Sequence, residues 1–287
     1  MTTLPAPGTP APRIAPSSTS ASKTPASSRS ALKDSATMFR RSLRHILRYP
    51  SMTILLVGTP IIVMLLFVYV FGGTLGTGLD GATGGRAAYV NYVAPGILLM
   101  TIAGAAQGTA ISVATDMTSG IIARFRTMPI SRASVLTGHV LGSMVQTALS
   151  LVVVVGVAMA IGFRPTAGFG GWVVAAGLLA LITLALTWLS VAFGLVSKSV
   201  ETASNLPMIL LLLPFLGSGF VPTDSMPGAL RWFAEYQPFT PFTETLRGLL
   251  LGGPIGNSGF LALAWCALIG GLSYLWARRL YRLRPAR

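Results

Sequence analysis

Six long stretches of the chain contain no charged side chain, and each is rich in apolar residues. They run from Arg48 to Asp80, Arg86 to Asp116, Arg132 to Arg164, Arg164 to Lys198, Glu201 to Asp224, and onward from Arg247. A helix needs about 20 apolar residues to cross the ~30 Å hydrocarbon layer of a bilayer. The pattern therefore predicts an all-α integral membrane protein with six transmembrane helices. These spans are expected near 52–71, 93–115, 139–162, 172–196, 205–221 and 259–277.

The composition is typical of a membrane protein. Of 287 residues, 52% are hydrophobic and 10% are charged, whereas soluble domains have roughly 25% charged residues. Residues 1–31 are rich in Pro, Ser, Thr and Ala and lack an apolar core, so we expect a disordered cytoplasmic tail. The transmembrane domain then covers residues 32–287. The one cysteine, Cys266, falls inside a predicted span and indicates neither a disulfide nor a metal site.

Positive charges fall mostly on one side of the predicted membrane. If the N-terminus is cytoplasmic, the inner segments carry 17 of the 21 Lys and Arg residues. The outer segments carry the other four, Arg86, Arg164, Arg231 and Arg247. Because basic loops stay in the cytoplasm, both termini are expected there. Topology and anionic lipid thus account for the net charge of +14, and we expect no nucleic-acid partner.

The segment 35–49, before the first span, has apolar and basic residues at helical spacing. One arc of a helical wheel holds the apolar residues Phe39, Leu43, Ile46 and Leu47. The adjacent arc holds the arginines Arg40, Arg41, Arg44 and Arg48. This pattern predicts a helix in the cytoplasmic membrane interface, with its guanidinium groups on lipid phosphates. The alternative is ordinary basic flanking of a first span.

The loop 116–132, between the second and third predicted spans, predicts a short amphipathic helix. Ile121, Phe125 and Met128 follow the spacing i, i+4, i+7 and form an apolar stripe. Pro129 should end this helix. An apolar face flanked by arginines indicates a docking element for a cytoplasmic partner, and a helix that rests on lipid headgroups is the alternative.

Residues 221–248 follow the fifth predicted span and predict two short helices. Asp224 or Ser225 is expected to cap the first helix, with Pro227 in its first turn. Thr240 is expected to cap the second helix. Two short, mostly apolar helices fit a hairpin that dips into the outer leaflet, which requires that protein or water satisfies their backbone. A folded outer loop on the headgroups is the alternative.

The sequence contains no motif for catalysis. It has no HExxH, no GxSxG and no cluster of Cys and His with ligand spacing. Lys198-Ser199 lacks the glycines that a phosphate-binding loop requires. We therefore expect that this chain is not an enzyme, does not itself hydrolyse ATP, and holds no cofactor or metal.

The placement of acidic residues argues against coupling to protons or sodium. Ion-coupled carriers keep carboxylates within their spans. Here Asp116, Glu201 and Asp224 lie only at the ends of predicted spans. His139 has no neighbouring carboxylate motif and predicts a packing or topological role rather than a proton relay.

Taken together, these features resemble the permease subunits of ABC-2 type transporters, closest to the daunorubicin-resistance class of drug exporters. The resemblance covers nearly the whole chain after the tail. It rests most on the segment 116–132, with its Asp, Gly120, the Arg-Phe-Arg and Met-Pro-Ile runs, and Arg132. Val-Ala-Pro-Gly at 93–96, Met226-Pro227, Gln-Pro-Phe-Thr at 237–240 and Leu-Arg-Gly-Leu at 246–249 add to it.

The resemblance implies a permease dimer, expected to be a homodimer, bound to two copies of a separate ATPase that binds ATP and Mg. The loop 116–132 would be the coupling helix, through Asp116, Gly120, Arg124, Phe125, Arg126, Pro129 and Arg132. The outer hairpin would be shaped by Asp224, Pro227, Pro238, Thr240 and Arg247. A hydrophobic or amphipathic compound would enter laterally between spans one and five and leave outward.

Three functions stay open on the sequence. The chain is expected to be the permease of a drug exporter in the plasma membrane of a bacterium. The first alternative is a permease of the same fold that exports a lipid or glycan precursor. The second is a membrane-embedded protein without an ATPase partner.

Overall fold

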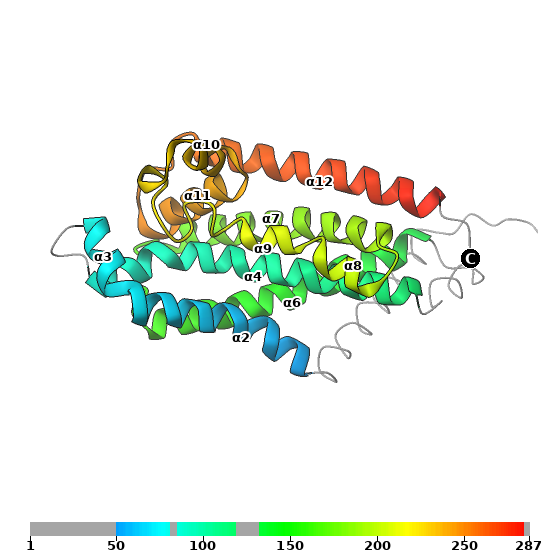
Figure 1. Cartoon of the computed structure of the whole chain (residues 1–287), viewed down its shortest axis with the longest axis horizontal. Helices are drawn as coiled ribbons and strands as arrows, with labels where there is room; N and C mark the ends of the chain where they lie inside the picture. Colours follow the sequence, from blue (N-terminus) through cyan, green and yellow to red (C-terminus); the bar gives the residue numbers. More distant parts are fainter. Residues whose placement is uncertain (1–49, 81–84, 119–131, 284–287) are drawn as a thin grey trace, which may run out of the picture.

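The computed structural model describes residues 50–80, 85–118 and 132–283, and within these ranges every regular element is helical. The predicted tail 1–31 and the interfacial helix 35–49 lie outside the described residues. So do Gly120, Arg124, Phe125, Arg126 and Pro129 of the predicted coupling segment. The helices lie side by side along the long axis of the molecule, with α10 and α11 gathered at one end (Figure 1). We call this the hairpin end, and the opposite end, where α12 finishes, the C-terminal end.

Five helical stretches are long and apolar enough to cross a membrane, and they confirm five of the six predicted spans. The first is formed by α2 (Pro50–Leu66), a π-helical turn η1 (Phe67–Phe71) and α3 (Gly72–Asp80). The others are α4 (Gly85–Thr118), α6 (Arg132–Ala160), α7 (Phe169–Val196) and α12 (Ser258–Leu283). Successive spans run in opposite directions between the two ends (Figure 1).

The predicted span over 205–221 is not one continuous helix in the structure. The structure has α8 (Val200–Asn205), α9 (Met208–Leu212) and then turns up to residue 220. Pro207 and Pro214 have no backbone N–H to donate, so the helical ladder is interrupted at both places. Side chains replace part of the lost bonding, because Gln107 Nε2 donates to Ser204 O at 2.9 Å and Gln237 Nε2 donates to Leu213 O at 2.9 Å.

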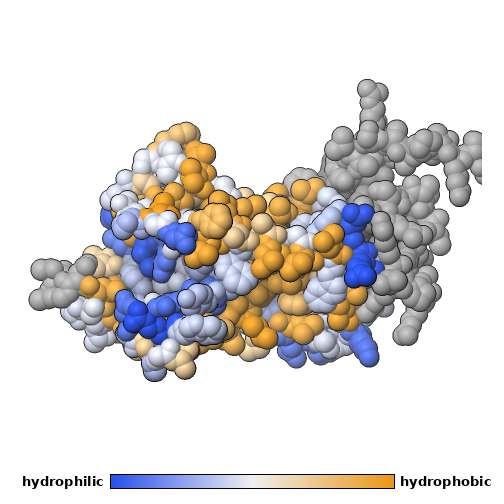
Figure 2. Space-filling model, turned by 90° about the horizontal axis from the view of Figure 1, so that it is seen from above, coloured by the Kyte–Doolittle hydropathy of each residue, from blue (hydrophilic) through white to orange (hydrophobic). Residues whose placement is uncertain are grey.

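Helix α4 lies at the centre of the bundle. In the most apolar part of α4, 72% of the residues are buried. The corresponding share is 17% for the first span and 22% for α12. The first span is also the most apolar of the five, so its exposed side chains suit a lipid environment rather than water. On the face seen from above, Figure 2 shows hydrophobic residues in the middle and hydrophilic residues toward the two ends.

Candidate functional site

The predicted coupling segment is flanked by α4 and α6 at the C-terminal end. Asp116 lies in the last turn of α4, and Arg132 is the first residue of α6. Asp116 Oδ2 lies 3.0 Å from His139 Nε2, and both side chains are half-buried. Seven residues deeper along α4, the hydroxyl groups of Thr109 and Ser143 share a 2.6 Å hydrogen bond. Two polar contacts therefore join the helices that enter and leave the segment.

A separate apolar cluster supports the same end. It joins four helices through Val113 of α4, Leu136 and Val140 of α6, Val191 and Leu195 of α7, and Ala277 of α12. Neither the first span nor α8 contributes a buried residue to it. The helices that flank the predicted coupling segment thus pack into a four-helix unit at this end.

The contact between Asp116 and His139 was missed by the sequence analysis, which assigned His139 to packing. One signal could have revealed it. A carboxylate near the C-terminus of a helix is unfavourable because that end of the macrodipole is negative. Asp116 therefore needed a cationic or hydrogen-bond-donating neighbour, and α6 is the adjacent helix.

At the hairpin end, two helices form as predicted: α10 (Gly228–Tyr236) and α11 (Phe239–Leu251). The predicted caps are wrong. Pro227 and Pro238 occupy the N-cap positions, and neither cap is made by a side chain. Asp224 lies instead in the short 3-10 turn η3 (Thr223–Ser225). Thr240 lies inside α11, where its hydroxyl donates to Ala234 O and accepts from Ser218 N. Proline starts these helices because its φ is already near the helical value.

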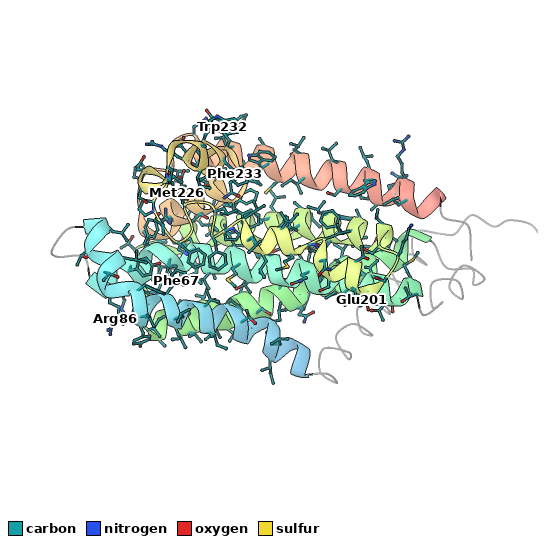
Figure 3. The ribbon with its side chains drawn as sticks, viewed as in Figure 1. Phe67, Arg86, Glu201, Met226, Trp232 and Phe233 are labelled. Atoms are coloured by element: carbon teal, nitrogen blue, oxygen red, sulfur yellow. The ribbon has the colours of Figure 1, made fainter. Side chains whose placement is uncertain are left out.

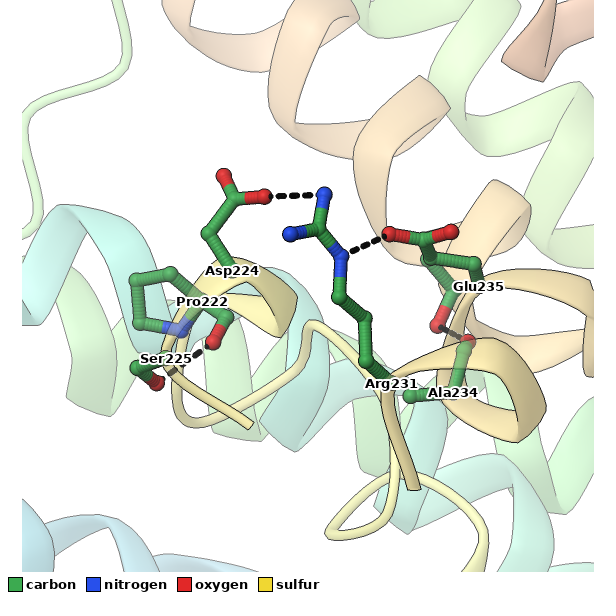
Figure 4. Close-up of polar contacts among 7 residues, drawn as sticks. Pro222, Asp224, Ser225, Arg231, Ala234 and Glu235 are labelled. Atoms are coloured by element: carbon green, nitrogen blue, oxygen red, sulfur yellow. Dashed lines mark hydrogen bonds and ion pairs between the residues drawn. The ribbon is translucent and has the colours of Figure 1, made fainter. Parts of the chain in front are cut away.

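An exposed ion-pair network holds η3 against α10 (Figure 4). Arg231 lies 2.7 Å from Asp224 Oδ1 and donates from Nε to Glu235 Oε1, also at 2.7 Å. The hydrogen bond to Glu235 raises the pKa of Arg231, and the charges of Glu235 and Asp224 act in the same direction. Asp224 thus has an observed partner in α10 although it caps no helix.

The two hairpin helices have opposite surroundings. Helix α11 is enclosed by the bundle, and Phe242 and Leu246 have no exposed surface. Helix α10 instead exposes 66% of Trp232 and 65% of Tyr236, and Trp232 and Phe233 lie at the outer edge of the bundle (Figure 3). One helix of the hairpin is therefore core, and the other presents aromatic side chains to its surroundings.

Arg247 of α11 connects three elements. Its Nη2 group donates to Ser218 O at 2.7 Å and to Tyr92 O at 3.1 Å, and the guanidinium carbon lies 3.8 Å from the centroid of the Tyr92 ring. Ser218 belongs to the irregular segment after α9, and Tyr92 belongs to α4. Arg247 therefore provides hydrogen bonds for a stretch of backbone that has no helical partners. No three His, Cys, Asp or Glu side chains of the described residues are grouped to hold a metal.

A helical bundle with five stretches long and apolar enough to cross a membrane has the architecture of an integral membrane protein. The chain belongs to the ABC-2 type transporter family, whose sequence profile matches residues 35–251.

Two kinds of resistance permease are similar to the chain. The chain is 29% identical to a daunorubicin resistance ABC transporter permease protein, DrrB1, of Streptomyces coeruleorubidus, over 88% of this chain and 89% of the relative. It is 24% identical to a probable doxorubicin resistance ABC transporter permease protein, DrrC, of Mycobacterium tuberculosis, over 55% of this chain and 57% of the relative.

Proposed function

We propose that this chain is the permease subunit of an ABC exporter that moves a hydrophobic or amphipathic drug out of the cell. The observation that carries the proposal is the similarity to a daunorubicin resistance permease along almost the whole length of both chains. The bundle supports it, because its apolar surface suits lipid and its interior is formed by a helix that is mostly buried. ATP and Mg are bound by a separate ATPase, and this subunit is not an enzyme.

The complete transporter is proposed to contain two copies of this chain and two copies of the ATPase. In each copy the segment 200–221 is the fifth of six crossings and is interrupted, since it begins at the C-terminal end and arrives at the hairpin end (Figure 1). The hairpin of α10 and α11 dips into the outer leaflet, with Trp232 and Tyr236 at the headgroups, where aromatic side chains are enriched.

The segment 116–132 is proposed to contact the ATPase, with Arg132 anchoring α6. The pair of Asp116 and His139 then acts as a brace that holds the two flanking helices together. We expect Asp116→Asn and His139→Gln each to lower transport per ATP hydrolysed by up to about fivefold, because a partly exposed pair contributes at most about 1 kcal/mol. The measurement is drug transport and ATP turnover in the same proteoliposomes.

A charge exchange is the control for this brace. The double variant Asp116→His with His139→Asp keeps both groups and should recover most of the lost coupling. Equal losses in the single variants and the exchanged variant would show that these residues act independently of each other.

The proposed orientation places both termini in the cytoplasm of a bacterium and the hairpin end outside its plasma membrane. In a Cys266→Ala background, a cysteine at exposed Ser225 should react with an impermeant maleimide on intact cells. A cysteine at exposed Lys198, near the opposite end, should react only after permeabilisation. The reverse labelling pattern would invert the topology.

Co-purification with the ABC ATPase encoded next to this chain tests the proposed function, followed by ATP turnover with and without daunorubicin. A stable complex whose turnover rises with the drug is the expected result. A complex that responds only to lipid or glycan precursors would assign it to another export pathway. The absence of any complex would favour a membrane protein that does not transport.

A further inference from the structure

Unpaired polar atoms are concentrated at one place in the bundle. Among the described residues, four buried side-chain atoms have no hydrogen-bond partner: Ser190 Oγ, Ser218 Oγ, Gln237 Oε1 and Arg247 Nε. Ser218 and Gln237 are only 3% and 5% exposed. Each such atom costs about 1–3 kcal/mol, so it requires a reason. Three of the four belong to residues that meet around Gly217 and Ser218.

Arg247 contacts Ser218 directly, and Gln237 lies against the neighbouring Gly217. Arg247 donates to Ser218 O at 2.7 Å, and Ser218 N donates to Thr240 at 3.2 Å. A Cβ atom on Gly217 would collide with the amide nitrogen of Gln237 and would lie 2.7 Å from Thr240 Oγ1. We call Ser218, Gln237 and Arg247 the polar cluster. It lies where α11, the irregular segment and α4 meet.

The polar cluster has a defined set of unused hydrogen-bonding groups. Gln237 Nε2 already donates to Leu213 O at 2.9 Å, so its Oε1 is an acceptor with a fixed orientation. Arg247 Nε is a donor, and the Ser218 hydroxyl can donate or accept. Within the described residues Arg247 has no carboxylate within 4.0 Å, since nearby Glu244 accepts instead from Ser258 at 2.6 Å. The set is complementary to a group that carries both a hydroxyl and a carbonyl oxygen.

Two aromatic residues, Phe215 and Phe220, lie on either side of Ser218 in the irregular segment. The rings of Phe215 and Phe220 stack with centroids 4.3 Å apart, and Phe67 lies 4.8 Å from Phe220. Phe67 opens the π-helical turn η1, and π-helical turns occur frequently at functional sites. Phe67 and Phe215 are half-buried, so their rings are partly accessible. Small-molecule sites are typically lined by aromatic and apolar side chains together with a few convergent polar groups, and this region has that composition.

We propose that the polar cluster, with Phe67 and Phe215, is a binding site for planar aromatic compounds that carry hydroxyl and carbonyl oxygens. The rings stack on the flat part of the compound, and the polar cluster bonds its oxygens. The proposal rests on the drug-export function above and names the substrate chemistry and the residues that recognise it. It places the contact at the hairpin end, between the first span and α11.

A pair of serine variants tests this site in the purified complex of permease and ATPase, with daunorubicin as the probe. Ser218→Ala removes one unpaired hydroxyl of the polar cluster and leaves its backbone bonds intact. Ser190→Ala removes an equally unpaired hydroxyl in α7 and is the matched control. We expect Ser218→Ala to raise the daunorubicin concentration for half-maximal ATPase stimulation about five- to tenfold, as for one lost hydrogen bond. Ser190→Ala should behave as wild type.

A second variant guards against an effect on folding. Phe67→Leu keeps an apolar side chain but loses the ring, and it should weaken daunorubicin stimulation in the same way. Wild-type stimulation with unchanged half-maximal concentrations in both Ser218→Ala and Phe67→Leu would overturn the site and leave the export function standing. No stimulation of the wild-type complex would overturn both.

Discussion

Replacing Gly96 by alanine is expected to destabilise the folded permease by about 1–3 kcal/mol, the cost typical of overpacking a well-packed interior. Gly96 lies in α4, where the irregular fifth segment crosses it. A Cβ atom there would lie 2.5 Å from Gly219 O and 2.9 Å from both Gly219 C and Cα. All three are backbone atoms, so no side-chain rotation relieves the contact. The measurement is the thermal midpoint of the detergent-solubilised protein.

Gly108 provides the control because it lies on the same helix in open surroundings. No atom comes within 4 Å of a Cβ built on Gly108. There alanine removes the helix penalty of glycine, so Gly108→Ala should stabilise by about 0.5–1 kcal/mol. The two substitutions are chemically identical and are expected to have opposite signs. A similar effect of both would show that α4 and the irregular segment are not in close contact.

Complex formation with the ATPase is expected to be lost in Phe125→Ala and in Arg126→Glu. In the proposed account, the ring of Phe125 and the charge of Arg126 make the contact, so truncation or charge reversal removes its anchor. Membrane insertion should be unaffected, because neither residue lies in a span predicted from the sequence. The measurement is the amount of ATPase that co-purifies with an equal amount of permease.

Lys198→Glu is the matched control for this experiment. It reverses a positive charge near the same end of the bundle but lies outside the segment 116–132. It should retain the ATPase. Unchanged co-purification in both Phe125→Ala and Arg126→Glu would remove the coupling assignment, and loss in Lys198→Glu as well would indicate a general charge effect.

The sequence was sufficient to predict the spans formed by ordinary helices. Long uncharged runs locate α4, α6, α7, α12 and the first span, because burying charge in lipid is expensive. It did not predict their full length: α4 runs over Gly85–Thr118 although the expected span was 93–115. The helix continues past the apolar core at both ends, and hydropathy does not report where a helix ends beyond that core.

The extent of the interruption in the fifth segment could not be predicted, for a related reason. Apolar composition identifies a chain that can enter the membrane, but it does not show which carbonyl groups find partners. Gln107, Gln237 and Arg247 supply hydrogen bonds from distant parts of the chain, so helix breaks at Pro207 and Pro214 are tolerated. No local motif could reveal these distant partners.

Transport in inside-out membrane vesicles tests the central claim most directly. Vesicles that contain this chain and its ATPase should accumulate daunorubicin when ATP and Mg are added. Vesicles with an ATPase variant that binds but does not hydrolyse ATP should not accumulate it. Accumulation that requires both hydrolysis and this chain is the predicted result. ATP-driven accumulation that is the same without this chain, or no accumulation in its presence, would contradict the account.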